Sequence, residues 1–333
     1  MPASTCRYEQ SPASPCVANS KHDCIPFNMT QQIEKVVAQV GSIILGKKHQ
    51  IRLAIACLLA RGHLLIEDIP GVGKTMLAHS LAASLGLNFQ RIQFTSDLLP
   101  ADIIGVSIYN RDTGGFQFHT GPIFNQVVLA DEVNRATPKA QSALLEAMEE
   151  HQVTTEGETR HLPEPFFVIA TQNPSYQIGT FPLPESQLDR FLMRIHLGYP
   201  DNEAERALLQ GQDRRDLLEG LKPCMTAQEL TELQHLAQQV HASSALLDYV
   251  QGLVNYSRRA ADYINGLSPR AALAVLHAAR AWALMSGRSH VLPEDVQAVL
   301  PGVVGHRLVP AGEVSRANGA DVVAQLIRQV PIP

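Results

Sequence analysis

The sequence lacks the features that mark membrane, secreted and nucleic-acid-binding proteins. Among its 333 residues, no run approaches the roughly 18 consecutive apolar residues of a membrane helix. The first residues do not place an apolar segment after a charged one, as a signal peptide does. The formal net charge of -5 argues against a dedicated nucleic-acid-binding protein, although a local basic groove stays open. We therefore expect a cytoplasmic protein.

Cysteine is also scarce. The five cysteines are odd in number and form no Cys-x-x-Cys pair, which argues against a disulfide framework. Three of them, Cys6, Cys16 and Cys24, lie near His22, but their spacing fits no familiar zinc pattern. Our interpretation is a set of reduced thiols rather than a metal site.

A strong local pattern does occur between His63 and Thr75. Mostly apolar residues at 63–66 predict a short buried strand, and regularly spaced leucines after Lys74 predict a helix. A turn containing proline and glycine separates the two. Strand, glycine loop and helix are the context of a phosphate-binding loop, because backbone N–H groups and the helix dipole attract an anion.

Within this loop, each residue type suits a part of the chemistry. Gly71 and Gly73 would let the backbone wrap a phosphate without a Cβ in the way. Lys74 would reach the β- and γ-phosphates of a nucleotide, and the Thr75 hydroxyl would bind Mg²⁺. The full motif has a glycine where this chain has Asp68, so the match is short, and an ordinary strand-to-helix turn with an exposed lysine is the alternative.

The order of predicted elements indicates the fold class. Residues 1–27 are rich in Pro, Ser and Ala and predict a disordered tail. Residues 28–200 alternate strands and helices, starting with a helix that we expect to end at Gly41, and predict an α/β fold with a mostly parallel sheet covered on both faces. Residues 201–333 show no strand pattern and predict an all-helical second domain.

Two β-hairpins are expected within the α/β region. The first would pair 106–109 with 116–119 through a glycine-containing turn, and the second would span 151–162 around Glu156-Gly157.

Polar residues follow two further predicted strands. Asp131 and Glu132 come directly after an apolar strand, where the first carboxylate could hold Mg²⁺ and the second could activate a water molecule. Asn173 follows the next apolar strand, at the sheet edge where α/β proteins bind ligands. Arg190 and Arg270 could each stabilise the charge of phosphoryl transfer. Taken singly, solvated acids, a turn asparagine and salt-bridged arginines are the simpler interpretations.

Taken together, these residues resemble the MoxR-type AAA+ ATPases, of the helix-2-insert branch. The resemblance covers about residues 33–308. Its segments are Gly62-His63-Leu64-Leu65-Ile66-Glu67-Asp68-Ile69-Pro70-Gly71-Val72-Gly73-Lys74-Thr75, Gln93-Phe94-Thr95-Ser96-Asp97-Leu98-Leu99-Pro100, Gly121-Pro122-Ile123-Phe124, Leu129-Ala130-Asp131-Glu132-Val133-Asn134-Arg135-Ala136 and Phe181-Pro182-Leu183-Pro184-Glu185-Ser186-Gln187-Leu188-Asp189-Arg190-Phe191. Asp68 is similar to usage within that family.

The resemblance implies roles for individual residues, with ATP and Mg²⁺ as cofactors. Residues 28–200 would be the nucleotide-binding domain and 201–333 its lid. Nucleotide contacts are implied for Gly46, Gly71, Val72, Gly73, Lys74, Thr75 and Met76, and metal contacts for Thr75 and Asp131. Catalytic roles are implied for Glu132 as base, Asn173 as sensor 1, Arg190 as arginine finger and Arg270 as sensor 2.

The resemblance also implies partners. The finger would act on the neighbouring subunit's nucleotide in a ring, usually a hexamer, with Arg194 as a second candidate interface arginine. Whether Arg270 acts within its own subunit or on the neighbour stays open. Family members are chaperone-like remodellers that work with von Willebrand A-domain proteins in assembly, activation or metal insertion. The alternatives are a nucleic-acid-dependent motor, which the acidic composition disfavours, and a nucleotide-bound scaffold without turnover, which intact Lys74, Glu132 and Arg190 disfavour.

Overall fold

The computed structural model describes residues 27–112, 114–173, 180–211, 213–311 and 319–332. Our predictions for the N-terminal tail and its three cysteines therefore lie outside the described residues. The exception is Phe27, which we placed in the tail and which instead begins the first helix, α1 (Phe27–Ile43).

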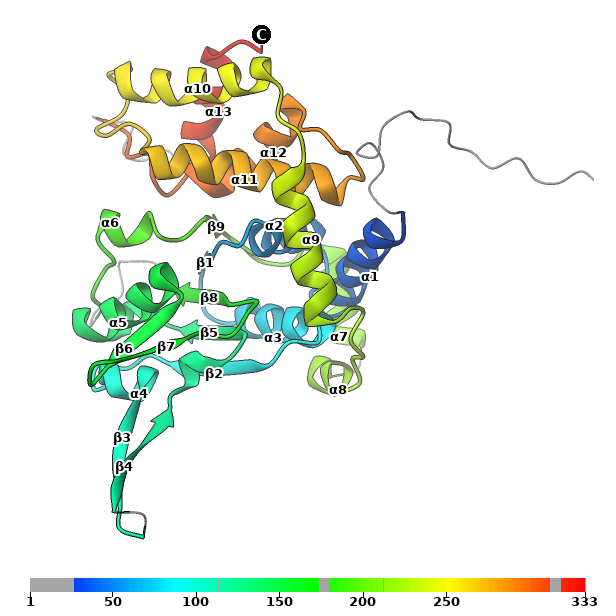
Figure 1. Ribbon diagram of the computed structural model, residues 1–333. Helices are drawn as coiled ribbons and strands as arrows, with labels where there is room; N and C mark the ends of the chain where they lie inside the picture. Colours follow the sequence, from blue (N-terminus) through cyan, green and yellow to red (C-terminus); the bar gives the residue numbers. More distant parts are fainter. Residues whose placement is uncertain (1–26, 113, 174–179, 212, 312–318, 333) are drawn as a thin grey trace, which may run out of the picture.

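Five parallel strands form the central sheet, in the order β2-β5-β8-β1-β9 (Figure 1). They are β1 (Leu64–Glu67), β2 (Phe89–Gln93), β5 (Val127–Asp131), β8 (Phe167–Gln172) and β9 (Met193–Ile195). Strand β5, which lies between β2 and β8, is buried along its whole length, as expected for a parallel sheet that helices cover on both faces. The α/β fold class that the sequence predicts is confirmed.

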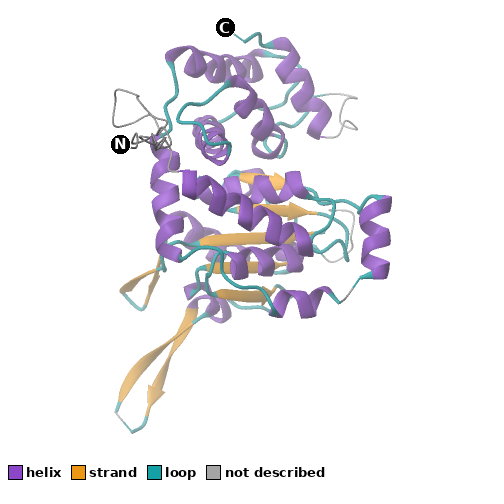
Figure 2. Ribbon diagram, turned by 90° about the vertical axis from the view of Figure 1, so that its right-hand side faces the viewer, coloured by secondary structure: helices purple, strands orange, loops and turns teal. Residues whose placement is uncertain are grey.

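Alternate side chains of these strands enter two separate cores, because successive residues of a strand point to opposite faces. On one face, Leu64 and Ile66 pack with α1, α2 (Lys48–Leu59) and α3 (Lys74–Ser84). On the other face, Leu65 packs with α5 (Pro138–Glu150). Figure 2 shows helices on both sides of the strands.

The helix predicted to end at Gly41 continues through it. Gly41 lies inside α1 and does not have the left-handed backbone that ends many helices at glycine. The glycine with that backbone is Gly46, whose φ is +71° and which lies between α1 and α2. Our prediction that the helix ends at Gly41 was therefore wrong, because the glycine with a left-handed backbone is Gly46.

Both predicted hairpins are present. Strands β3 (Gly105–Asn110) and β4 (Gly115–Thr120) pair antiparallel and project from the body below the short helix α4 (Pro100–Ile104) (Figure 1). Strands β6 (Gln152–Thr155) and β7 (Glu158–His161) form the second hairpin beside α5. Two 3-10 helices, Pro122–Phe124 and Val133–Arg135, and the short helix α6 (Glu185–Leu188) complete this part.

After β9, the described residues form helices and no further named strand. These helices are α7 (Asn202–Gln210), α8 (Arg214–Glu219), α9 (Ala227–Gln239), α10 (Ser244–Arg259), α11 (Pro269–Met285), α12 (Pro293–Val304) and α13 (Gly319–Gln329). Several share one continuous core with α1 and α2, so the division into domains at residue 200 stays a prediction. None of the described helices combines the length and apolar character that a membrane crossing requires.

Candidate functional site

The loop between β1 and α3 has the conformation that the glycine pattern predicts. Gly71 and Gly73 have φ values of +87° and +94°, in the left-handed region that glycine adopts without steric penalty. A Cβ added to Gly71 would meet no atom within 4 Å, so the backbone there borders open space. Gly73 is the N-cap of α3 and leaves the first N–H groups of that helix facing the loop.

Lys74 begins α3 and its side chain turns back under the loop. Its Nζ donates to the backbone oxygens of Asp68 and of Ile69, the latter at 3.2 Å, and to Asn173 Oδ1 at 3.1 Å. Burial lowers the pKa of Lys74, and the nearby carboxylates of Asp68, Asp131 and Glu132 oppose that shift. The ammonium group is therefore held near the loop by oxygen atoms that a phosphate could replace.

Asp68 explains why the loop does without its usual first glycine. Its Oδ2 accepts hydrogen bonds from the backbone N–H groups of Leu197 at 2.7 Å and Gly198 at 2.6 Å, and Oδ1 accepts from Ile69 at 2.9 Å. The backbone of Asp68 is not among those with positive φ, so the position does not require glycine. The carboxylate instead ties the start of the loop to the chain after β9.

The two acids after the apolar strand are placed differently. Asp131 is the last residue of β5, and its carboxylate accepts from Thr171 Oγ1 at 2.6 Å and from Arg91 Nη2 at 2.6 Å. Glu132 follows with φ of +57°, a left-handed conformation that costs a non-glycine residue about 1–2 kcal/mol. Such strained residues concentrate at functional sites.

Glu132 has partners on three elements. Its Oε1 accepts from Asn173 Nδ2 at 3.0 Å, and its Oε2 accepts from Gln93 Nε2 at 3.1 Å and pairs with Arg135 Nε at 3.0 Å. Asn173 therefore contacts both the loop lysine Lys74 and this carboxylate. The amide joins the two groups that the sequence assigns to phosphate binding and to proton abstraction.

A cavity of about 300 Å³ lies at the centre of this arrangement. It brings together most of the residues predicted to bind nucleotide or metal or to act in catalysis, namely Gly71, Gly73, Lys74, Thr75, Met76, Asp131, Glu132 and Asn173, with Pro70. Val72 and Gly46 are not among its lining residues in the described part of the chain. Val72 packs against the apolar core, while Gly46 contacts the region of Asp201 and Ala204.

The residues fit Mg²⁺ and a nucleotide. A hydroxyl from Thr75 and a carboxylate from Asp131 are the hard oxygen donors that Mg²⁺ prefers. The open space beside Gly71 and the uncapped start of α3 suit a phosphate. Ile44 approaches the loop from the side, since a Cβ on Gly73 would lie 3.6 Å from Ile44 Cδ1.

The two predicted catalytic arginines lie away from this cavity and close to each other. Arg270 Nη2 donates to Glu149 Oε1, and Arg190 Nε lies 3.8 Å from Glu149 Oε2. Glu149 is near the end of α5, about 16 Å along the helix axis from its start. Neither arginine is among the described residues that line the cavity. The third candidate, Arg194, is engaged inside the chain by Glu67 at 2.8 Å and by the Gly305 carbonyl at 2.8 Å.

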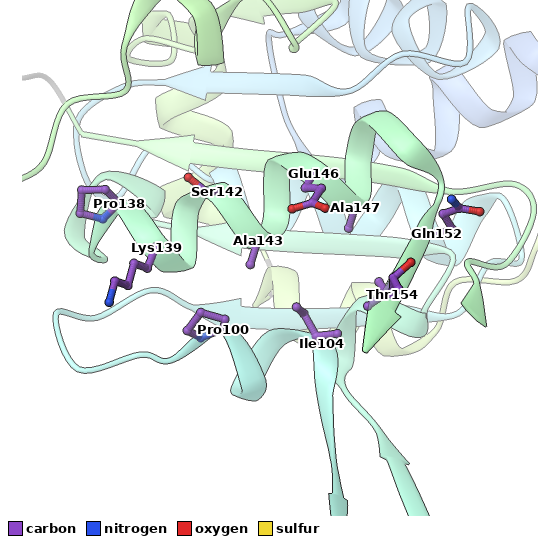
Figure 3. A pocket seen from close by; sticks show the side chains of 11 residues that line it. Pro100, Ile104, Pro138, Lys139, Ser142, Ala143, Glu146, Ala147, Gln152 and Thr154 are labelled. Carbon is purple, nitrogen blue, oxygen red and sulfur yellow. The ribbon is translucent and has the colours of Figure 1, made fainter. Parts of the chain in front are cut away.

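A second cavity, of about 530 Å³, lies between α4, α5 and β6 (Figure 3). Pro100, Ile104, Lys139 and Glu146 line it together with small and polar residues. It contains no residue of the phosphate loop and no paired acids. We therefore place the candidate site at the smaller cavity, which Lys74, Asp131 and Glu132 line.

Sequence reasoning missed the residues that support the site. Gln93, Thr171 and Arg91 hold the two acids, yet each comes from a strand whose residues we treated only as structure. The sequence carried one signal, because Thr171 lies two residues before Asn173. The register that places Gln93 opposite Asp131 is known only from the structure. Glu149 carried no signal, because nothing in the sequence links it to the two arginines.

Two family models match parts of this chain. The model of the ATPase family associated with various cellular activities (AAA) matches residues 63–193, and the AAA lid domain matches residues 257–326. An uncharacterized protein YeaC from Bacillus subtilis is 44% identical over 301 residues, which cover 90% of this chain and 94% of that protein.

Two further relatives extend the comparison. Chaperone MoxR1 from Mycobacterium tuberculosis is 41% identical over 291 residues, covering 83% of this chain and 75% of that protein. A crystal structure from Cytophaga hutchinsonii, of a protein assigned as an ATPase, superposes with a TM-score of 0.84 at 37% identity and covers 92% of this chain and 96% of the other.

Proposed function

Because this chain belongs to the MoxR family of AAA+ ATPases, we propose that it hydrolyses ATP with Mg²⁺ at the β1–α3 loop and works as a chaperone-like remodeller. One observation carries the catalytic part of the proposal. The Asn173 amide contacts Lys74 Nζ at 3.1 Å and Glu132 Oε1 at 3.0 Å, so the groups for phosphate binding and for water activation share one fixed partner.

The roles of the site residues follow from their chemistry. Gly71, Gly73 and the start of α3 would hold the phosphates, and Lys74 would release its backbone carbonyl partners to bind the β- and γ-phosphate oxygens. Thr75 and Asp131 would hold Mg²⁺. Glu132 would orient and deprotonate the attacking water, while Asn173 positions that water and the γ-phosphate.

The position of the two arginines supports action on a neighbouring subunit. Arg190 and Arg270 share Glu149 at the far end of α5, away from their own nucleotide cavity. A second copy bound head-to-tail would bring its cavity to this surface, and repetition of such a contact closes a ring. We propose a hexamer in which Arg190 stabilises the transition-state charge in the neighbour, with Arg270 on the same side.

The remodelling part of the proposal rests on the family. Chaperone MoxR1 is similar over most of its length, and the proteins named MoxR in Paracoccus denitrificans and Methylorubrum extorquens share 32% and 31% identity with this chain. We propose that the cytoplasmic ring uses hydrolysis to assemble, activate or load metal into a client complex, together with a von Willebrand A-domain partner.

Steady-state ATP hydrolysis against protein concentration tests the proposal. Specific activity should rise with concentration, because a ring must assemble, and should fall at least about 100-fold in Arg190→Ala. Arg206→Ala removes an exposed arginine from α7 and is the matched control, expected to keep wild-type activity. Hydrolysis that is independent of concentration and of Arg190 would contradict the ring, and no hydrolysis with or without a client would favour the scaffold.

A further inference from the structure

The segment that carries Arg190 has no regular structure of its own. It follows α6, which ends at Leu188, and precedes β9, which begins at Met193. Within it, the carbonyl oxygens of Asp189, Phe191 and Leu192 are not used by a helix or a sheet. Buried carbonyls without partners destabilise a fold, so something else must fix this turn.

All three carbonyls accept hydrogen bonds from one buried side chain of the C-terminal region, Arg307. Its Nη2 donates to the carbonyl oxygens of Asp189 at 2.9 Å and Phe191 at 2.8 Å, and its Nη1 donates to the carbonyl of Leu192 at 3.1 Å. Its Nε donates to the Asp189 carboxylate at 2.6 Å. The Arg307 side chain is only 5% exposed, so these bonds form where water does not compete.

Two further contacts tie the same turn to the helical region. His306 Nε2 lies 3.2 Å from the Phe191 carbonyl, and Ser268 Oγ donates to the second Asp189 carboxylate oxygen at 3.2 Å. Ser268 is the N-cap of α11, which carries Arg270 in its first turn. The carboxylate of Asp189 thus joins the Arg190 turn to the helix of the other catalytic arginine.

Charge favours this arrangement over a chance contact. Burial lowers the pKa of Arg307, and the hydrogen bond and charge of Asp189 oppose that shift. A buried guanidinium is tolerated when it is paired and its donors are used, as they are here. The planar fork of arginine can bridge several carbonyls at once, which the single ammonium group of lysine cannot do in the same geometry.

We propose that Arg307, with Asp189 as its counterion, is a positioning residue that fixes the backbone of residues 189–192 and thereby the direction in which Arg190 reaches the neighbouring subunit. The C-terminal helical region then helps to position the Arg190 side chain. This inference rests on the proposed function, because only there does Arg190 act on a neighbour. Arg307 itself is not among the described residues that line the nucleotide cavity.

Subunit mixing tests the inference. In Arg307→Met, each nucleotide cavity keeps its own residues, but the turn that positions Arg190 loses its hydrogen bonds. We expect kcat to fall about 100-fold, because misplacement of a catalytic group by about 1 Å has an effect of that size. The affinity for ATP should stay within about twofold of wild type. Arg307→Lys keeps the charge and should lose less. Glu132→Gln subunits keep Arg190 in position but lack the base, so we expect them to be inactive on their own.

Mixed rings should recover activity. In a one-to-one mixture of Arg307→Met and Glu132→Gln, about a quarter of the interfaces pair an intact cavity with an intact finger, so activity should return to at most about a quarter of wild type. Arg190→Ala mixed with Glu132→Gln is the reference, because it tests the trans finger itself. If this reference does not recover, the proposed function fails; if it recovers but the Arg307→Met mixture does not, the inference fails.

A second variant covers the case in which Arg307→Met does not fold. Asp189→Asn preserves shape and removes the counterion, and thermal unfolding shows whether it remains folded. We expect reduced kcat with unchanged ATP affinity, and recovery on mixing with Glu132→Gln. Wild-type kcat in folded Asp189→Asn and folded Arg307→Lys, or a loss in Asp189→Asn that mixing does not restore, would overturn the inference.

Discussion

Replacement of Glu132 by glutamine should separate nucleotide binding from hydrolysis. The substitution removes the general base and the ion pair with Arg135, but leaves one amide oxygen that can still accept a hydrogen bond from Asn173 or from Gln93. The Arg135 pair is half exposed, so its loss should change the free energy of unfolding by at most about 1 kcal/mol. Loss of a general base lowers the rate about 10²–10⁴-fold, or about 3–5 kcal/mol in activation free energy.

The assay measures phosphate release and the binding of a fluorescent ATP analogue on the same preparations. Glu146→Gln is the matched control, because Glu146 is an exposed glutamate of α5 that lines the other cavity and its substitution changes the charge equally. We expect Glu132→Gln to bind nucleotide like the wild type without turnover, and Glu146→Gln to retain both. Turnover above about a tenth of wild type in Glu132→Gln would refute the assignment of the base.

Three further predictions concern stability, pH and the arginine pair. Gly62→Ala would place a Cβ 2.3 Å from Leu192 Cβ and should lower the free energy of unfolding by about 1–3 kcal/mol, whereas Gly41→Ala, inside α1 with open space, should raise it by about 0.5–1 kcal/mol; thermal unfolding measures both. Burial lowers the pKa of His63 to about 4, so below pH 6.5 the unfolded state binds a proton that the folded state does not. Stability should fall as the pH drops from 6.5 to about 4, by up to about 3 kcal/mol from this group, and denaturant titrations of His63→Gln should show a shallower fall. Glu149→Ala breaks only partly exposed ion pairs and should change ATPase activity less than about fivefold, against the far larger loss in Arg190→Ala; a comparable loss would give Glu149 a role beyond pairing.

Local patterns in the sequence predicted most of the fold. The strands of the sheet are short apolar runs bounded by turn residues, and these were assigned correctly because the period of a strand is local information. The predicted end of α1 at Gly41 was wrong because a glycine typically ends a helix where its backbone is left-handed. The sequence around Gly41 does not reveal which backbone conformation that glycine adopts. Phe27 joined a helix rather than the tail for a similar reason, since helix starts depend on tertiary packing.

The site residues that directly follow predicted strands could be predicted from the sequence. Lys74, Asp131 and Glu132 each follow a predicted strand, and parallel strands bring their carboxyl ends to one edge, so their convergence could be expected. Gly46 and Val72 came from resemblance alone, and neither is found in the lining of the cavity. Asp68 could not be interpreted from the motif, because its partners, the N–H groups of Leu197 and Gly198, are about 130 residues away in the sequence.

The positions of Arg190 and Arg270 also depend on residues that are far away in the sequence. The turn around Arg190 is held by Arg307, which lies 118 positions from Asp189, and Arg190 shares Glu149 with Arg270 of a third element. Neither Arg190 nor Arg270 is among the described residues that line the nucleotide cavity of the same subunit. Glu132, the proposed base, does line that cavity, so the base and the proposed finger of one chain do not lie at the same cavity. This separation is the reason for our proposal that Arg190 acts on a neighbouring copy, and the Arg307 contacts connect its turn to the C-terminal helical region.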